Sequence, residues 1–158
     1  DDKDNQISDE ELKSRWEQQK EQEKSDPSRV LDEVGAKLPA MMRAQKLQDE
    51  AAEYYFDWPD AGPVLDKIEE EIRELRDAFE RRHDEHIKDE MGDLLFACVN
   101  LARHLKLDAE SALRQTNEKF IRRFDYVVAR MQRAGIEFSP EQLEQMEAFW
   151  QQSKNVTG

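Results

Sequence analysis

The chain has 158 residues, about the size of one domain, and its 24 Lys and Arg against 37 Asp and Glu give a net charge of −13 at pH 7. This acidic balance argues against general binding to nucleic acids or anionic membranes, and no apolar run is long enough to cross a bilayer. A single cysteine, Cys98, excludes an internal disulfide and a cysteine-based zinc site. Together with few glycines and no visible signal peptide, the composition predicts a soluble, cytoplasmic, helical protein.

Residues 1–36 differ in composition from the rest. The first 26 residues hold ten acids and five bases with few apolar side chains, which predicts an acidic linker or arm, partly disordered. Ser8 and Glu11 fit a capping box, so a short polar helix from about Ser8 to Lys24 is expected. Because the chain starts at Asp1 without a methionine, we expect it to be a fragment of a longer protein.

Five amphipathic segments follow and predict an all-α bundle. Pro39 is expected at the first position of the first helix, Asp108 as the cap of the fourth, and Gly135 just beyond its end. Ser139 is expected to cap the fifth helix with its side chain, with Pro140 at the first helical position and a capping-box partner after it. The predicted helices are 39–55, 63–82, 86–105, 109–134 and 140 onward.

The third predicted helix combines an apolar surface with acidic residues. Residues 93–102 are apolar nearly all round, which predicts burial, and Cys98 is expected to be a small core residue. Yet Glu90, Asp93 and Asn100 lie at roughly 300°, 240° and 220° from Ile87 on an ideal helix. These three polar residues therefore form one stripe beside the apolar stripe.

The second predicted helix repeats this arrangement with Glu71 and Glu74, at roughly 300° and 240° from Ile68. A short connection makes the two helices antiparallel neighbours, so the two carboxylate pairs can meet. Four carboxylates at close range repel strongly unless a cation lies between them. The pattern predicts a site for a hard divalent cation, Mg²⁺ or Mn²⁺, which takes oxygen ligands.

The fourth predicted helix supplies positive charge. Residues 113–133 hold six bases and two acids, and Lys119 and Arg123 flank its apolar stripe on the side that the carboxylates occupy in their own helices. Carboxylates that hold a metal opposite Lys and Arg are the arrangement that phosphoanhydride chemistry needs.

Each of these features also has a simpler structural reading. A Glu-x-x-Glu pair is usually a solvated face, and Lys119 and Arg123 alone are typical surface charges. Phe149 and Trp150 are expected to be packing residues. Glu80 and His83 form half of a di-iron carboxylate signature, but a second Glu-x-x-His is missing.

A set of motifs in one order resembles a known family. Glu71-Ile72-Arg73-Glu74, followed after 15 residues by Glu90-Met91-Gly92-Asp93, resembles the ExxE…ExxD signature of the MazG nucleoside triphosphate pyrophosphohydrolases. The four carboxylates show no departure from it. The resemblance covers about residues 38–154 and extends to further stretches at 38–46, 56–58, 99–105, 117–124 and 146–150.

The resemblance implies an all-α fold in which two subunits pair to build a four-helix bundle around each site. It implies metal-dependent hydrolysis of a nucleoside triphosphate (NTP) to a nucleoside monophosphate and pyrophosphate. It also implies that the chain is a linker (1–36) and the second domain (37–154) of a tandem-domain bacterial protein, with a tail at 155–158.

The family's functional residues carry over to matching positions. Glu71, Glu74, Glu90 and Asp93 would be the metal ligands and catalytic carboxylates. Lys119 and Arg123 would hold the phosphates, Lys67 could contact the nucleotide or its phosphates, and Trp150 would lie near the nucleotide. Asn100 is added for its place on the polar stripe.

Three alternatives remain open at this point. The first is the same chemistry on another substrate, dUTP or phosphoribosyl-ATP. The second is a catalytically silent helical dimer that acts as an interaction module. The third is a carboxylate-bridged iron protein, which the missing second histidine motif disfavours.

Overall fold

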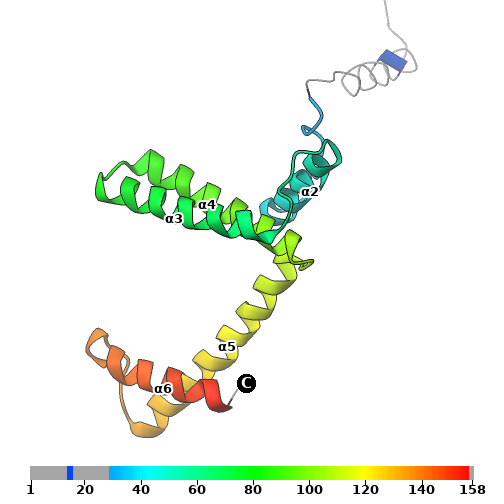
Figure 1. Ribbon diagram of the computed structural model, residues 1–158. Coiled ribbons are helices and arrows are strands. Elements are labelled where there is room, and N and C mark those ends of the chain that lie inside the picture. Colours follow the sequence, from blue (N-terminus) through cyan, green and yellow to red (C-terminus); the bar gives the residue numbers. More distant parts are fainter. Residues whose placement is uncertain (1–13, 16–28, 157–158) are drawn as a thin grey trace, which may run out of the picture. The chain divides into compact units, whose positions relative to one another are not determined.

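The computed structural model describes residues 14–15 and 29–156, and this part of the chain is helical without a strand (Figure 1). The all-α prediction is therefore confirmed. The polar helix predicted from Ser8 to Lys24 lies, apart from 14–15, outside the described residues, as does most of the predicted arm. The elements are α2 (Ala40–Glu53), α3 (Ala61–Glu80), α4 (Asp84–His104), α5 (Ala109–Ala134), the short 3₁₀ helix η1 (Pro140–Gln142) and α6 (Leu143–Val156).

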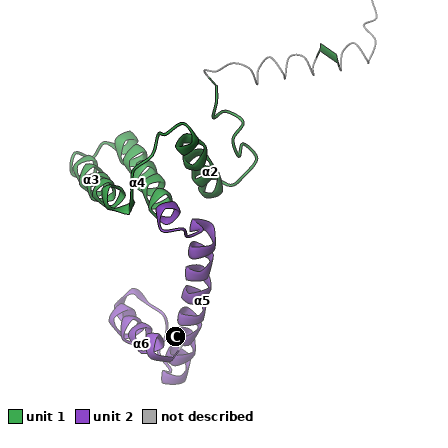
Figure 2. Ribbon diagram, turned by 45° about the vertical axis from the view of Figure 1, so that its right-hand side comes forward, with its two compact units in different colours: residues 1–101 green, residues 102–158 purple. Residues whose placement is uncertain are grey.

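The chain divides into two compact units, Asp1–Leu101 and Ala102–Gly158 (Figure 2). In the first unit, successive turns over residues 30–37 lead into α2. Arg43 on α2 ties these turns down, because its Nε donates to the carbonyl of Val34 at 3.2 Å and its Nη2 to that of Asp32 at 3.1 Å. The segment before α2 is thereby attached to the first unit.

Two helix starts differ from the prediction. Pro39 is the N-cap of α2, with φ −53° and ψ 149°, and not its first helical residue. The helix α3 starts at Ala61, two residues earlier than expected, because the Asp60 side chain accepts a hydrogen bond from the Gly62 amide at 2.8 Å. Pro63 then lies in the first turn, where its missing N–H leaves no intrahelical bond unmade.

The helices α3 and α4 lie side by side, joined by a short connection, as both views show (Figures 1 and 2). Their buried apolar residues are small: Val64, Ala78, Ala97 and Val99. The prediction that α4 is buried all round is wrong, since Leu95 is 54% exposed and Cys98 is also exposed. The described helices of the first unit bury Ala97 and Val99 of α4 but leave Met91, Leu95 and Phe96 at the surface.

The second unit is built from α5 and α6, which pack against each other (Figure 2). Asp108 caps α5 by accepting from the Ser111 amide, and Gly135, with φ 67°, ends it, as predicted. The predicted side-chain cap by Ser139 is wrong, because this serine makes no capping hydrogen bond and η1 precedes α6. The unit's core consists of Val127, Met131 and Phe149 with Ile136, Met146 and Trp150 packed against it.

Within the described part of the chain, no helix combines the length and the apolar character needed to cross a membrane.

Candidate functional site

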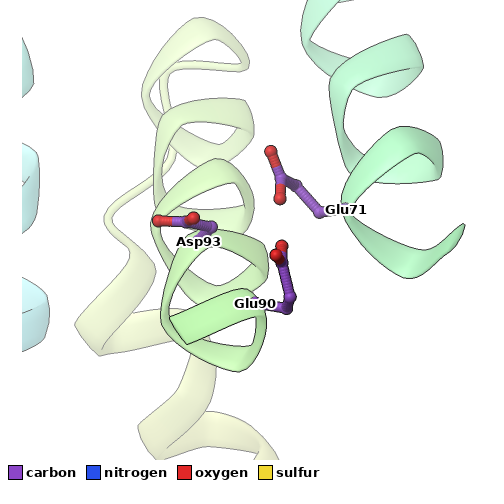
Figure 3. Close-up of side chains that lie close together, drawn as sticks. All are labelled: Glu71, Glu90 and Asp93. Atoms are coloured by element: carbon purple, nitrogen blue, oxygen red, sulfur yellow. The ribbon is translucent and has the colours of Figure 1, made fainter. Parts of the chain in front are cut away.

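Three of the four predicted carboxylates come together between α3 and α4. Glu71 on α3 and Glu90 and Asp93 on α4 each offer a carboxylate oxygen, and these oxygens lie within 4.8 Å of one another. Glu71 extends from α3 toward α4, where the side chains of Glu90 and Asp93 lie (Figure 3). The helical register brings Glu71 of α3 to the acidic pair of α4, because the two helices are adjacent and Glu71 lies on the facing side of α3.

The fourth carboxylate, Glu74, is not part of this three-residue cluster, but its charge affects the pKa of Glu90 in the cluster. The pKa of Glu90 is raised above its usual 4.5, first by partial burial and then by the negative charges of Glu74, Glu71 and Asp93, against a smaller opposing effect of His86. Negative charge is therefore concentrated between α3 and α4, and a bound cation would reduce the repulsion among the carboxylates.

Glu71 is the buried member of the cluster, with 4% of its surface exposed. Its Oε1 accepts from the Lys67 ammonium at 2.7 Å, and Lys67 also lies 2.9 Å from Glu70. The hydrogen bonds to Glu71 and Glu70 raise the pKa of Lys67 and keep it charged. The other oxygen of Glu71, Oε2, is buried and has no hydrogen-bond partner. The charge on Oε1 is thus compensated by Lys67, whereas Oε2 has no partner.

These residues suit a divalent cation. The donors are all carboxylate oxygens, which are the ligands that Mg²⁺ prefers. A buried carboxylate oxygen without a partner is energetically costly, and coordination to a cation would satisfy it. Asp93 is exposed and Glu90 only partly buried, so one side of the cluster is accessible to solvent and to a charged ligand.

The remaining predicted residues are divided between the units. Asn100 follows Asp93 on α4, half-buried and engaged in an interaction within the chain. Lys119 and Arg123 lie on α5, and Trp150 lies on α6 with its ring centroid 5.2 Å from that of Phe120. The prediction that Trp150 and Phe149 are packing residues is confirmed, because both belong to the core of the second unit.

One residue beside the site, Gln48, is buried without any signal in the sequence. This residue is 6% exposed, and its Nε2 donates to the carbonyl of Phe96 at 2.9 Å, one turn beyond Asp93 on α4. The bond holds α2 against the helix that carries Glu90 and Asp93. A glutamine in an amphipathic helix gives no local signal of burial, so no sequence feature pointed to it.

Comparison with known proteins agrees with the geometry. The MazG nucleotide pyrophosphohydrolase domain model matches residues 63–128, which include the four carboxylates, Lys67, Lys119 and Arg123. The nucleoside triphosphate pyrophosphohydrolase of Escherichia coli K12 is 47% identical over 150 residues, which are 91% of this chain and 56% of that protein.

Two further relatives have lower sequence identity to this chain. The nucleoside triphosphate pyrophosphohydrolase/pyrophosphatase MazG of Thermotoga maritima is 37% identical over 140 residues, 88% of this chain and 54% of the relative. The uncharacterized protein YabN of Bacillus subtilis is 40% identical over 157 residues, 98% of this chain and 32% of the relative. The chain thus spans about half the length of the first relatives, and over residues 63–128 it is similar to the MazG nucleotide pyrophosphohydrolase domain.

Proposed function

We propose that this protein hydrolyses nucleoside triphosphates to nucleoside monophosphates and pyrophosphate with the help of Mg²⁺. The observation that carries the proposal is the open Oε2 of the buried Glu71 beside Glu90 and Asp93, within a stretch that matches the MazG domain. Such a group of acids next to the proposed substrate needs a cation, because carboxylates and phosphates would otherwise repel each other.

The four carboxylates Glu71, Glu74, Glu90 and Asp93 would hold Mg²⁺, or Mn²⁺ in its place. When bound, the cation supplies charge that stabilises the phosphate oxygens in the transition state. Glu71 or Glu74 orients a water molecule and accepts its proton. The water oxygen bonds to the α-phosphorus while the bond from that phosphorus to the bridging oxygen breaks, and the pyrophosphate leaves with the electron pair.

The basic and aromatic residues bind the rest of the substrate. We assign the phosphates to Lys119 and Arg123, the nucleotide to Trp150, and a polar contact to Asn100. Lys67 neutralises Glu71 while no cation is present. Once a cation takes over that role, the Lys67 ammonium can turn to a phosphate oxygen, because it is held only by ion pairs within its own helix, with Glu71 and Glu70.

We further propose that residues 37–154 act as a homodimer in the cytoplasm, where nucleoside triphosphates are made and used. Several large apolar side chains of α3 and α4 are 42–70% exposed, a cost that a second subunit would remove. These are Leu65, Ile72, Phe79, Met91, Leu95 and Phe96.

The test is product analysis. The protein is incubated with ribo- and deoxyribonucleoside triphosphates, dUTP and phosphoribosyl-ATP, with Mg²⁺ or with EDTA, and the products are resolved by ion-exchange chromatography. Monophosphate and pyrophosphate formed only with the metal support the proposal and rank the substrates. Diphosphate with orthophosphate would place cleavage at another bond, and no turnover of any substrate would favour the silent interaction module.

A further inference from the structure

The helix α5 carries a row of three bases that reaches beyond the two assigned to the substrate. On an ideal helix Arg123 and Arg130 lie roughly 40° and 20° from Lys119, so all three occupy one face. Each of the three is partly buried. Arg130 has no role in the proposed reaction, yet it continues the row two turns further along α5.

Among the described residues, both arginines of this row, Arg123 and Arg130, lack a partner of opposite charge. The Nε atoms of Arg123 and Arg130 are buried without a hydrogen-bond acceptor, and neither guanidinium forms an ion pair within the described part of the chain. A buried guanidinium N–H without an acceptor costs free energy, so an anion that supplied an acceptor would bind favourably.

The Arg130 guanidinium is also held in place. Its Cζ lies over the Phe149 ring, 5.3 Å from the centroid, and Phe149 is 7% exposed within the core of Val127 and Met131. This contact with a buried ring restricts the guanidinium, and its Nη groups are the part that can meet a ligand, because Nε is buried. A side chain already ordered in this way loses little further entropy when it binds an anion.

We infer that Arg123 and Arg130 form a subsite for phosphate groups on the second unit, and that this subsite takes the pyrophosphate product. The identity of the anion rests on the proposed function. Two guanidinium groups offer planar forks that match phosphate oxygens bidentately. Their Cα atoms are ~10 Å apart along the helix axis, a span that two long side chains can close around a small dianion or trianion.

The experiment is calorimetric titration of the full chain with sodium pyrophosphate in EDTA, which needs no turnover. Arg130→Gln should weaken pyrophosphate binding ~10-fold, the loss expected for a hydrogen bond to a charged group. Arg130→Lys should also bind more weakly, because lysine keeps the charge and lacks the fork. Arg114→Gln is the matched control: Arg114 lies on the opposite face of α5, 71% exposed, and its loss changes the net charge equally.

Several outcomes would overturn the inference. These are no pyrophosphate binding by the wild-type protein, unchanged affinity in Arg130→Gln, or equal losses in Arg130→Gln and Arg114→Gln, which would report only the general field. Thermal denaturation separates packing from binding: a lower Tm with unchanged affinity would leave Arg130 as a partner of Phe149 alone. Titration with AMP should be insensitive to Arg130→Gln, and pyrophosphate binding without any NTP hydrolysis would contradict the proposed function while leaving the subsite in place.

Discussion

The Lys67 ammonium lies 2.7 Å from the Oε1 of Glu71, one helical turn away, and the second oxygen of the same carboxylate is buried without a partner. The two oxygens therefore differ in what they can do. Oε1 is compensated by a cation of the protein itself, and Oε2 is left for a ligand. Lys67 makes the burial of Glu71 tolerable, since an uncompensated buried carboxylate is strongly destabilising.

Replacing Lys67 by methionine tests this relationship. Lys67→Met keeps the apolar stem and removes the charge, so in EDTA the free energy of unfolding should fall by about 1 kcal/mol, a value reduced for the partial exposure of Lys67. Mg²⁺ should then raise the Tm more than in the wild type. Urea unfolding measures the first effect and thermal denaturation the second, with the exposed Lys88→Met as the control in both. A variant as stable as the wild type in EDTA would contradict the role assigned to Lys67.

Glu90→Gln should leave the helix intact and nearly abolish hydrolysis. Glutamine has the same shape but no charge, so we expect a loss of at least ~100-fold in kcat/KM. Circular dichroism should be unchanged. Asp89→Asn removes a neighbouring exposed charge on α4 and should keep activity close to that of the wild type. Equal activity in Glu90→Gln and Asp89→Asn would rule out Glu90 as part of the site.

The raised pKa of Glu90 gives the metal-free protein a distinct pH dependence. The folded state holds this proton more tightly than the unfolded state, so the stability contribution is fully present below 4.5 and is lost as pH rises through the raised pKa. In EDTA, wild-type stability should fall relative to Glu90→Gln as pH rises above 4.5. Urea titrations of both proteins across this range measure the difference, and parallel curves would show that Glu90 does not titrate abnormally.

The contribution of the buried Gln48 amide to stability can be tested with one apolar and one charged replacement. Gln48→Leu removes the bond to Phe96 together with the unpartnered Oε1, so the free energy of unfolding should change by less than ~1 kcal/mol. Gln48→Glu places an acceptor-only, charged group against a carbonyl and should cost ~2 kcal/mol or more at pH 7. Chemical denaturation compares the two variants. If Gln48→Glu were as stable as Gln48→Leu, water would reach the side chain of residue 48 more readily than its burial indicates.

Tyr55 offers a stabilising change. It has φ 63°, a conformation that suits glycine, and 97% of its surface is exposed, so its side chain contributes little packing. Tyr55→Gly should raise the free energy of unfolding by about 1 kcal/mol. The neighbouring Tyr54, with φ −93°, is the control, because Tyr54→Gly relieves no strain and should be neutral or destabilising. A lower Tm for Tyr55→Gly would indicate that the tyrosine side chain is held by a contact.

The helices were predictable because their signals are local. The helix α5 begins after Asp108 and ends before Gly135, as expected, because a capping carboxylate and a left-handed glycine act within one turn. The exposure of Leu95 and Cys98 was not predictable. Apolar residues on all sides of a helix indicate that each side is buried. The pattern does not show whether the covering segment belongs to the same chain or to a second subunit.

The sequence by itself determined the helical elements and the stripes of Glu71, Glu74, Glu90 and Asp93, because side-chain direction along a helix follows from its period. Only the tertiary structure decided that Glu71 is the buried carboxylate with one open oxygen, and that Glu74 stands outside the closest group. It also decided that Gln48 holds α4 and that Phe149 orients Arg130. These properties depend on which helices cover which side chains, and burial and electrostatic environment arise only when distant segments pack together.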